Sequence, residues 1–402
     1  IGSSSLNGLE SFNINSFQSI NQLSIGSSSL NKLSSISFNS VNSLNRLTIG
    51  SNSLKGVKWI ELNGLNSVSV MVIESSSLRG IETMRMGIVN RVTLSSFGIS
   101  SCQSSSCMIM NESSILGNMR EFMVLNNGLN GMIQFKISGL SKLESVIIGN
   151  GSAQGVLSSD SVFSIENCSS LRSLVIGANA VVNYNRFELI GLNELSSFNY
   201  NSILLSNVVS IRFSSIPLTS FLIGSNMFGS VRELTLQGMS ELKSVVIGEN
   251  SFRMSGVKRN DGLLKITNCG KLESIELRNG SFEDYESIQL NGLVSLHNMI
   301  FGSRCFKYAS SLSLDGLNGL RSIRFGSSSF SETESLIIGS NSTLNDIVIG
   351  SGSLNGIHSL SIGSNSLNSI SSFPFYSIQT INSISIGSSS LNGLESFNIN
   401  SF

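Results

Sequence analysis

An apolar anchor residue, Ile or Phe and almost always followed by Gly, returns at steps of 24 residues along much of the chain. The anchors stand at Ile1, Ile25, Ile49 and Ile73, at Ile223 and Ile247, and at Phe301, Phe325 and Ile349. A fixed period of this size is the signature of stacked structural repeats. We therefore expect residues 1–402 to form a single continuous repeat array, in place of the two or three globular domains that the length would suggest.

Each repeat carries two short stretches of alternating apolar residues with the period of a β-strand. Val245 and Ile247 form the alternation at one anchor, and side chains two places apart share one face of a strand. Leu234 and Leu236 form the second alternation, which follows the anchor Ile223. We expect an all-β, right-handed solenoid of about 16 coils with 24 residues each and two short parallel strands per coil.

The pattern also predicts a turn directly after each anchor strand. Asn or Ser stands three residues after the anchor, as in Asn250 and Ser328, and such side chains bond to the backbone where a chain turns. Stacked coils would align them in a ladder. The next place is nearly always small, as in Ser251, which indicates a crowded inward corner. Because Cys305 occupies this place, we interpret it as a small buried residue and not as a reactive thiol.

Two strands in every coil predict low curvature. Stacked strands lie about 4.8 Å apart, so the two sides of the coil have nearly equal spacing and the solenoid stays almost straight. Sixteen such coils would make a rod of roughly 75 to 80 Å.

The chain resembles a known family at the level of the repeat. The segment from Leu242 to Phe252 matches the unit Leu-x-x-Leu-x-Leu-x-x-Asn-x-Leu of leucine-rich repeats place for place, with other apolar residues at some Leu positions. The run from Cys168 to Leu174 is most similar to the BspA-type subclass. The resemblance covers nearly the whole chain and implies a solenoid. Gly after the anchor and Ser in place of Asn depart from the family pattern.

The charge balance argues against several classes of partner. Charged residues make up 12% of the chain, and 25 basic residues balance 25 acidic ones. No positive field is present to attract nucleic acid or an anionic membrane, and no apolar run approaches the roughly 20 residues of a membrane span. A surface of Ser, Asn and Gly resists self-association less than a charged one. Lateral packing of copies is therefore an expected property.

Catalysis, metal binding and cofactor binding have little support in the sequence. The two histidines, His297 and His358, stand in separate repeats, and no nucleophile or phosphate-binding motif is present. We expect no enzyme activity, no metal and no cofactor. The acidic residues Glu283, Asp284 and Glu286 follow Phe282 in a turn, where a solvated acidic loop is favoured over a catalytic cluster.

The odd number of cysteines does not indicate a disulfide framework. Cys102 and Cys107 are the one local pair, and Cys168 and Cys269 replace core residues of the second strand. Unpaired thiols favour a reducing compartment, whereas low charge and abundant Ser and Asn favour the cell exterior. The exterior or cell surface is slightly preferred over a cytoskeletal location.

Irregular insertions interrupt the repeat near residues 97–114 and 253–262. The second insertion concentrates charge in a neutral surface, and loops on a rigid scaffold often bind partners. Its candidate partner residues are Arg253, Lys258, Arg259 and Asp261. A tolerated insertion with solvated charges is the alternative interpretation, and it is favoured.

The first seventeen residues recur letter for letter as the last seventeen, 386–402. Uncapped coils of a solenoid expose apolar faces that neighbours would cover, so these ends are candidate contact sites. The predicted end-to-end contact residues are Ile1, Leu6, Leu9, Phe12, Ile14, Phe17, Ile386, Leu391, Leu394, Phe397, Ile399 and Phe402.

The leading functional hypothesis is a structural repeat protein. Its solenoid would continue end to end into a rod or filament, within one giant chain or by head-to-tail stacking of copies. The expected partner is the chain itself, with other structural proteins or glycans as further candidates. The alternative, implied by the family resemblance, is a cell-surface adhesion module that recognises a protein or glycan.

Overall fold

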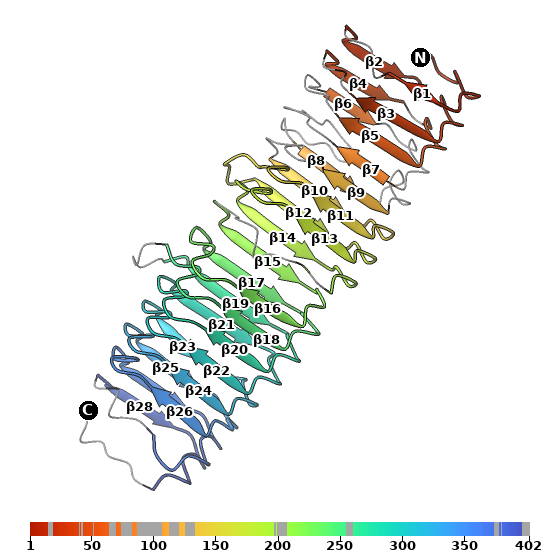
Figure 1. Cartoon of the computed structure of the whole chain (residues 1–402). Coiled ribbons are helices and arrows are strands. Elements are labelled where there is room, and N and C mark those ends of the chain that lie inside the picture. The colour runs from red at the N-terminus through yellow and green to blue at the C-terminus, as the bar shows by residue number, and fades with distance from the viewer. Residues whose placement is uncertain are drawn as a thin grey trace. The chain divides into compact units, whose positions relative to one another are not determined.

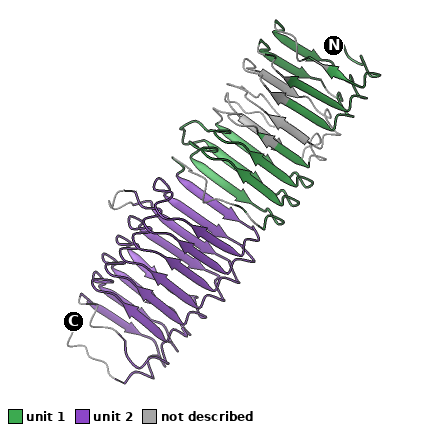
Figure 2. Cartoon of the chain, in the orientation of Figure 1, with its two compact units in different colours: residues 1–208 green, residues 209–402 purple. Residues whose placement is uncertain are grey.

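The computed structural model describes residues 1–14, 19–39, 41, 43–50, 52–63, 70–73, 83–86, 107–111, 120–124, 133–196, 198, 207–254, 260–373, 378 and 380–395. These residues form parallel β-strands joined by turns, the architecture of a β-solenoid (Figure 1). They include no helix that is long and apolar enough to cross a membrane. The chain divides into two compact units, Ile1–Val208 and Val209–Phe402, which are described separately (Figure 2).

The strands of unit 1 stack in parallel in every pair. One sheet has the order β1 (Phe12–Asn13), β3 (Ser35–Asn39), β5 (Trp59–Asn63), β7 (Thr83–Met86), β9 (Glu121–Val124), β11 (Ser145–Ile148) and β13 (Ser173–Ile176). A second contains β2 (Gln22–Ile25), β4 (Arg46–Ile49) and β6 (Val70–Ile73). The remaining strands stack in the order β8 (Cys107–Asn111), β10 (Gln134–Ser138), β12 (Val162–Glu166) and β14 (Arg186–Ile190).

Unit 2 repeats this arrangement. One stack has the order β15 (Ser210–Ser214), β17 (Glu233–Gln237), β19 (Leu263–Thr267) and β21 (Ser287–Asn291). A second contains β16 (Ser220–Ile223), β18 (Ser244–Ile247), β20 (Ser274–Leu277), β22 (Asn298–Phe301), β24 (Ser322–Phe325) and β26 (Asp346–Ile349). A third contains β23 (Ser311–Ser313), β25 (Ser335–Ile338), β27 (Ser359–Ile362) and β28 (Ser383–Ile386).

The 24-residue spacing is confirmed, but the predicted number of coils is wrong. Leu23 pairs with Leu47, and Ile323 pairs with Ile347. The described residues make about 11 turns, fewer than the 16 predicted. The spacing departs from 24 residues in places, since Thr83 in β7 pairs with Glu121 in β9. Handedness, low curvature and the single continuous array stay predictions.

The predicted alternation of apolar side chains builds the core. Val245 and Ile247 in β18 are buried, as are Leu234 and Leu236 in β17, while Val246 between the anchor pair is half-buried. Burial of this kind removes apolar surface from water at about 25 cal/mol per Å². The repeating core therefore runs between the two stacks of strands.

The predicted turn has left-handed backbone at two places. Asn250 has φ 54° and Phe252 has φ 57°, although positive φ costs a non-glycine residue roughly 1–2 kcal/mol. A column of aromatic rings offsets this cost. Centroids lie 5.3, 4.6, 5.4 and 5.4 Å apart along the sequence Phe228, Phe252, Phe282, Phe306 and Phe330.

The small residue at the inward corner is buried, as predicted. Ser251 Oγ donates a hydrogen bond to the carbonyl of Gly224 in the preceding coil, at 2.6 Å. Cys305 takes the same place, and its Sγ lies 3.6 Å from Ser281 Oγ. Burial raises the pKa of the Cys305 thiol to about 12. The interpretation of Cys305 as a small buried residue is confirmed.

Candidate functional site

The first coil exposes a position that is buried in the coils behind it. Leu6 is 50% exposed, whereas Leu30 and Leu54, one and two repeats later, are 0% exposed. Ile1, Leu9 and Phe12 are half-buried, and Ile14 is buried. Phe17 lies outside the described residues. The predicted contact residues of this end therefore form a partly open apolar surface centred on Leu6.

The last described coil shows the same pattern. Ile386 is 43% exposed, whereas Ile362 in the preceding coil is 1% exposed. Leu391 and Leu394 are half-buried, although their counterparts one repeat earlier are buried. The predicted contact residues Phe397, Ile399 and Phe402 lie outside the described residues.

Serine side chains bond several coils to the coil before, whereas in other coils the serine donates within its own turn, as Ser329 Oγ does to Gly326 O at 2.7 Å. Ser29 Oγ donates to Gly2 O at 2.8 Å, and Ser390 Oγ donates to Gly363 O at 2.7 Å. Ser5 is the counterpart of Ser29 in the first coil. Its hydroxyl donates within its own turn, to Ser3 O at 3.3 Å.

Asparagine side chains form a second series of bonds between coils. The backbone N–H of Asn31 donates to the side-chain Oδ1 of Asn7 at 3.1 Å. The backbone N–H of Asn392 likewise donates to Asn368 Oδ1 at 3.1 Å. Donors therefore point toward the preceding coil at this place. Asn392 carries the corresponding acceptor of the last described coil.

The charged residues of the insertion at 253–262 pair within the chain where the structure describes them. Arg253 Nε lies 2.9 Å from Glu283 Oε2, and Asp261 Oδ2 lies 2.6 Å from Arg232 Nη1. Lys258 and Arg259 lie outside the described residues. Arg253 and Asp261 are thus engaged in holding the base of the insertion.

The expectation of a solvated acidic loop is wrong for Glu283 and Asp284, because both are buried. Arg304 Nε lies 3.8 Å from Glu283 Oε2, on which Arg253 also converges, and Asp284 Oδ2 accepts the amide N–H of Met254 at 2.8 Å. The two carboxylates therefore fasten the insertion to the next coil. The flanking Phe282 and Tyr285, both core aromatics, are the sequence signal that could have indicated burial.

The remaining predicted positions lie in the core, in strand β8 or outside the described residues. Cys168 and Cys269 are buried in the core, as predicted, and burial raises the pKa of the Cys168 thiol to about 11. Of the other predicted irregular stretch, 107–111 forms the regular strand β8, while Cys102 lies outside the described residues. Across the part of the chain that the structure describes, no three His, Cys, Asp or Glu side chains converge to hold a metal ion.

Comparison with protein-family models finds no match to the chain, and comparison with curated proteins finds none either. The fold and the side chains at its ends therefore carry the functional argument.

Proposed function

We propose that this is a structural repeat protein whose solenoid continues end to end into a rod or filament. Continuation takes one of two forms: a longer covalent array, or head-to-tail stacking of copies through an open heterologous contact. We propose further that the repeats are leucine-rich repeats of the BspA type, on the place-for-place match at Leu242 to Phe252.

The observation that carries the proposal is the exposure of Leu6, which is 50% exposed although Leu30, one repeat later, is 0% exposed. In a head-to-tail contact, Ser5 Oγ would donate to Gly387 O of a second copy. The amide N–H of Asn7 would likewise donate to Asn392 Oδ1 of that copy.

Apolar contacts complement these hydrogen bonds. Leu6 would pack on Leu391 and become buried, as Leu30 at the same place of the next coil is (0% exposed). Residues 1–17 and 386–402 are identical, so the contact would join equivalent coils. Fully burying each Leu is favourable by about 1.5–3 kcal/mol, which favours association over exposed ends.

Charge placed at either end tests the stacking form. We expect the 402-residue chain to form concentration-dependent oligomers in analytical ultracentrifugation, and Leu6→Glu or Leu391→Glu to weaken association at least ten-fold. The matched control is Val294→Glu, because Val294 is an exposed apolar residue (71%) away from the ends. This control should assemble as the parent chain does.

Mixing the two end variants identifies the geometry. Leu6→Glu retains an intact last coil and Leu391→Glu retains an intact first coil, so the mixture should form heterodimers and no larger species. Monomers of the parent chain at all concentrations would contradict the stacking form, and equal effects of Val294→Glu would contradict end contacts.

The recognition module remains a second candidate function. It is favoured by one specific observation, a cleft in unit 2 that is lined largely by polar side chains. A cell-surface or extracellular location fits both candidates and is proposed with them.

A further inference from the structure

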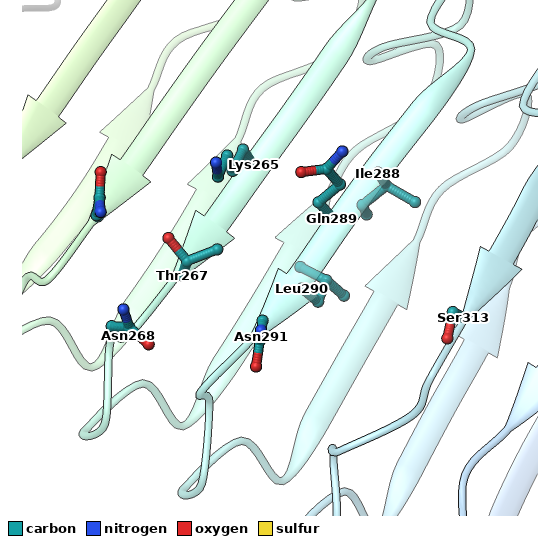
Figure 3. Close-up of a pocket in the computed structure, with 9 residues that line it drawn as sticks. Lys265, Thr267, Asn268, Ile288, Gln289, Leu290, Asn291 and Ser313 are labelled. Carbon is teal, nitrogen blue, oxygen red and sulfur yellow. The ribbon is translucent and has the colours of Figure 1, made fainter.

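A cleft of about 510 Å³ opens on the outer face of unit 2, over β17, β19, β21 and β23 (Figure 3). This volume falls in the range of about 300–1,000 Å³ that is typical of small-ligand sites. The cleft lies in the interior of the unit's repeat series, away from the coil that contains β28.

A break between strands produces the cleft. β21 is the last strand of its sheet and β23 is the first strand of another, whereas β22 and β24 remain paired on the opposite side of the same coils. The coils therefore separate on one face. Ile288 and Leu290 of β21 are each 9% exposed, although Leu264 and Ile266 in the preceding coil are 1% and 0% exposed. These two side chains lie on the core-facing side of β21 and line the cleft at the edge of the sheet.

Polar side chains from neighbouring strands form the walls. Lys265 in β19 pairs in register with Gln289 in β21, and Thr267 pairs with Asn291. Figure 3 shows these four residues on adjacent strands. The wall thus combines one cation with amide and hydroxyl groups that both donate and accept hydrogen bonds.

Most of these polar side-chain groups have no hydrogen-bond or ion-pair partner among the described residues. Across the described residues, Lys265 Nζ has no carboxylate or hydrogen-bond partner, and Thr267 Oγ1 is buried without a partner. On the neighbouring strand, by contrast, Thr235 Oγ1 donates to Glu233 Oε1 at 3.1 Å. Arg212 Nη2 donates a hydrogen bond to Gln237 Oε1 at 3.1 Å. The side-chain NH₂ group of Gln237 is therefore left to donate to a ligand.

We propose that this cleft binds a saccharide that bears a carboxylate, such as a uronic acid residue of a polysaccharide. A sugar ring presents a C–H face that can contact the apolar edge at Ile288 and Leu290. Its hydroxyl groups match the amides of Gln289 and Asn291, which donate and accept. The carboxylate pairs with Lys265, which no carboxylate of the described residues neutralises.

The proposal does not depend on the end-to-end contact, because the cleft and the end coils use different residues. Leu6→Glu should therefore bind the saccharide as the parent chain does. A failure of one proposal leaves the other intact.

Calorimetric titration of the 402-residue chain with trigalacturonate tests the site, with the methyl-esterified trisaccharide as the neutral probe. We expect binding of trigalacturonate and at least ten-fold weaker binding of the ester. Lys265→Met should weaken trigalacturonate binding at least ten-fold, and Gln289→Ala should weaken both probes. The matched control is Lys243→Met, because Lys243 is exposed outside the cleft.

Three results would overturn the proposal: no binding by the parent chain, equal affinity for acid and ester, or unchanged binding by Lys265→Met. Circular dichroism melting of each variant separates loss of binding from loss of fold. An acidic peptide that binds where trigalacturonate does not would also overturn it.

Discussion

Each unit contains an insertion that enlarges a coil. The residues around the two insertions pack in a similar way but use different polar groups. Ile148 pairs with Ile176 in unit 1, and Ile247 pairs with Leu277 in unit 2, so both coils exceed 24 residues. A buried tyrosine follows each insertion along the chain. It is Tyr184 in unit 1 and Tyr285 in unit 2. Both rings fill space beside a glycine of the insertion.

The contacts of the two rings correspond closely. A methyl group added at Gly155 would lie 2.9 Å from the Tyr184 ring, and one added at Gly262 would lie 2.9 Å from the Tyr285 ring. The hydroxyl groups differ. Tyr285 donates to Val231 O at 2.6 Å, whereas the Tyr184 hydroxyl is buried without a hydrogen-bond partner among the described residues.

The fastening of the insertions differs as well. In unit 2 the buried carboxylates Glu283 and Asp284 hold the insertion, whereas in unit 1 neutral bonds do so, such as Asn185 Nδ2 to Ser159 O at 2.8 Å. The aromatic ring and its glycine are thus the shared requirement of an enlarged coil. The hydroxyl and the charges are particular to one unit.

Truncating either ring should have the largest effect. We expect Tyr184→Ala and Tyr285→Ala each to lower the free energy of unfolding by about 3–5 kcal/mol, because each leaves a core cavity. Urea unfolding measures the loss, and hydrogen exchange of β14 or β21 locates it, since repeat arrays can open locally. Tyr308→Ala, a half-buried control, should cost clearly less. If only one of the two truncations lowered the free energy of unfolding by this amount, the two rings would not have the same structural role.

Filling either glycine should have an intermediate effect. Gly155→Ala and Gly262→Ala place a methyl group against a ring, and overpacking of this kind costs about 1–3 kcal/mol. Gly270→Ala is the matched control, because its nearest neighbouring atom would lie 3.9 Å away. In a double-mutant cycle, Gly155→Ala should lose part of its cost when Tyr184 is also Ala, because two ring atoms 2.9 Å from the added methyl group are removed while Asn183 O, also 2.9 Å away, stays. Simple additivity would show that ring and glycine do not interact.

Removing the hydroxyl groups should have the smallest effect and should separate the two units. Tyr285→Phe loses a hydrogen bond and should cost about 1 kcal/mol. Tyr184→Phe should be neutral or slightly stabilising, because it removes a buried hydroxyl that has no described partner. Thermal melting compares the two variants. Equal losses would mean that Tyr184 has a hydrogen-bond partner.

The regular parts of the fold could be predicted from the sequence because they depend on local patterns. Alternation predicted the buried faces of β17 and β18, and a small residue after Asn250 predicted the inward corner. The half-buried anchor Ile1 and the exposed anchor Ile386 mark the same periodic position in the two end coils.

The irregular parts depend on contacts between coils, which one repeat does not encode. In the pairing of β7 with β9, Met86 faces Val124, so a second-position strand stacks on an anchor-type strand. Burial of Glu283 depends on arginines from the preceding and following coils, and the cleft depends on a separation of β21 from β23. Neither signal lies within a single 24-residue unit.

The hydrogen bonds between coils also set how a unit responds to force. Bonds such as Gly26 N–H to Ile1 O, 2.8 Å, and Gly387 N–H to Ile362 O, 2.7 Å, run along the stacking direction. Tension applied at a terminal coil would load these bonds one coil at a time, as in opening a zipper. Each released repeat would add about 80 Å of extended chain. A material built from such units would yield by stepwise lengthening and would absorb work before it broke.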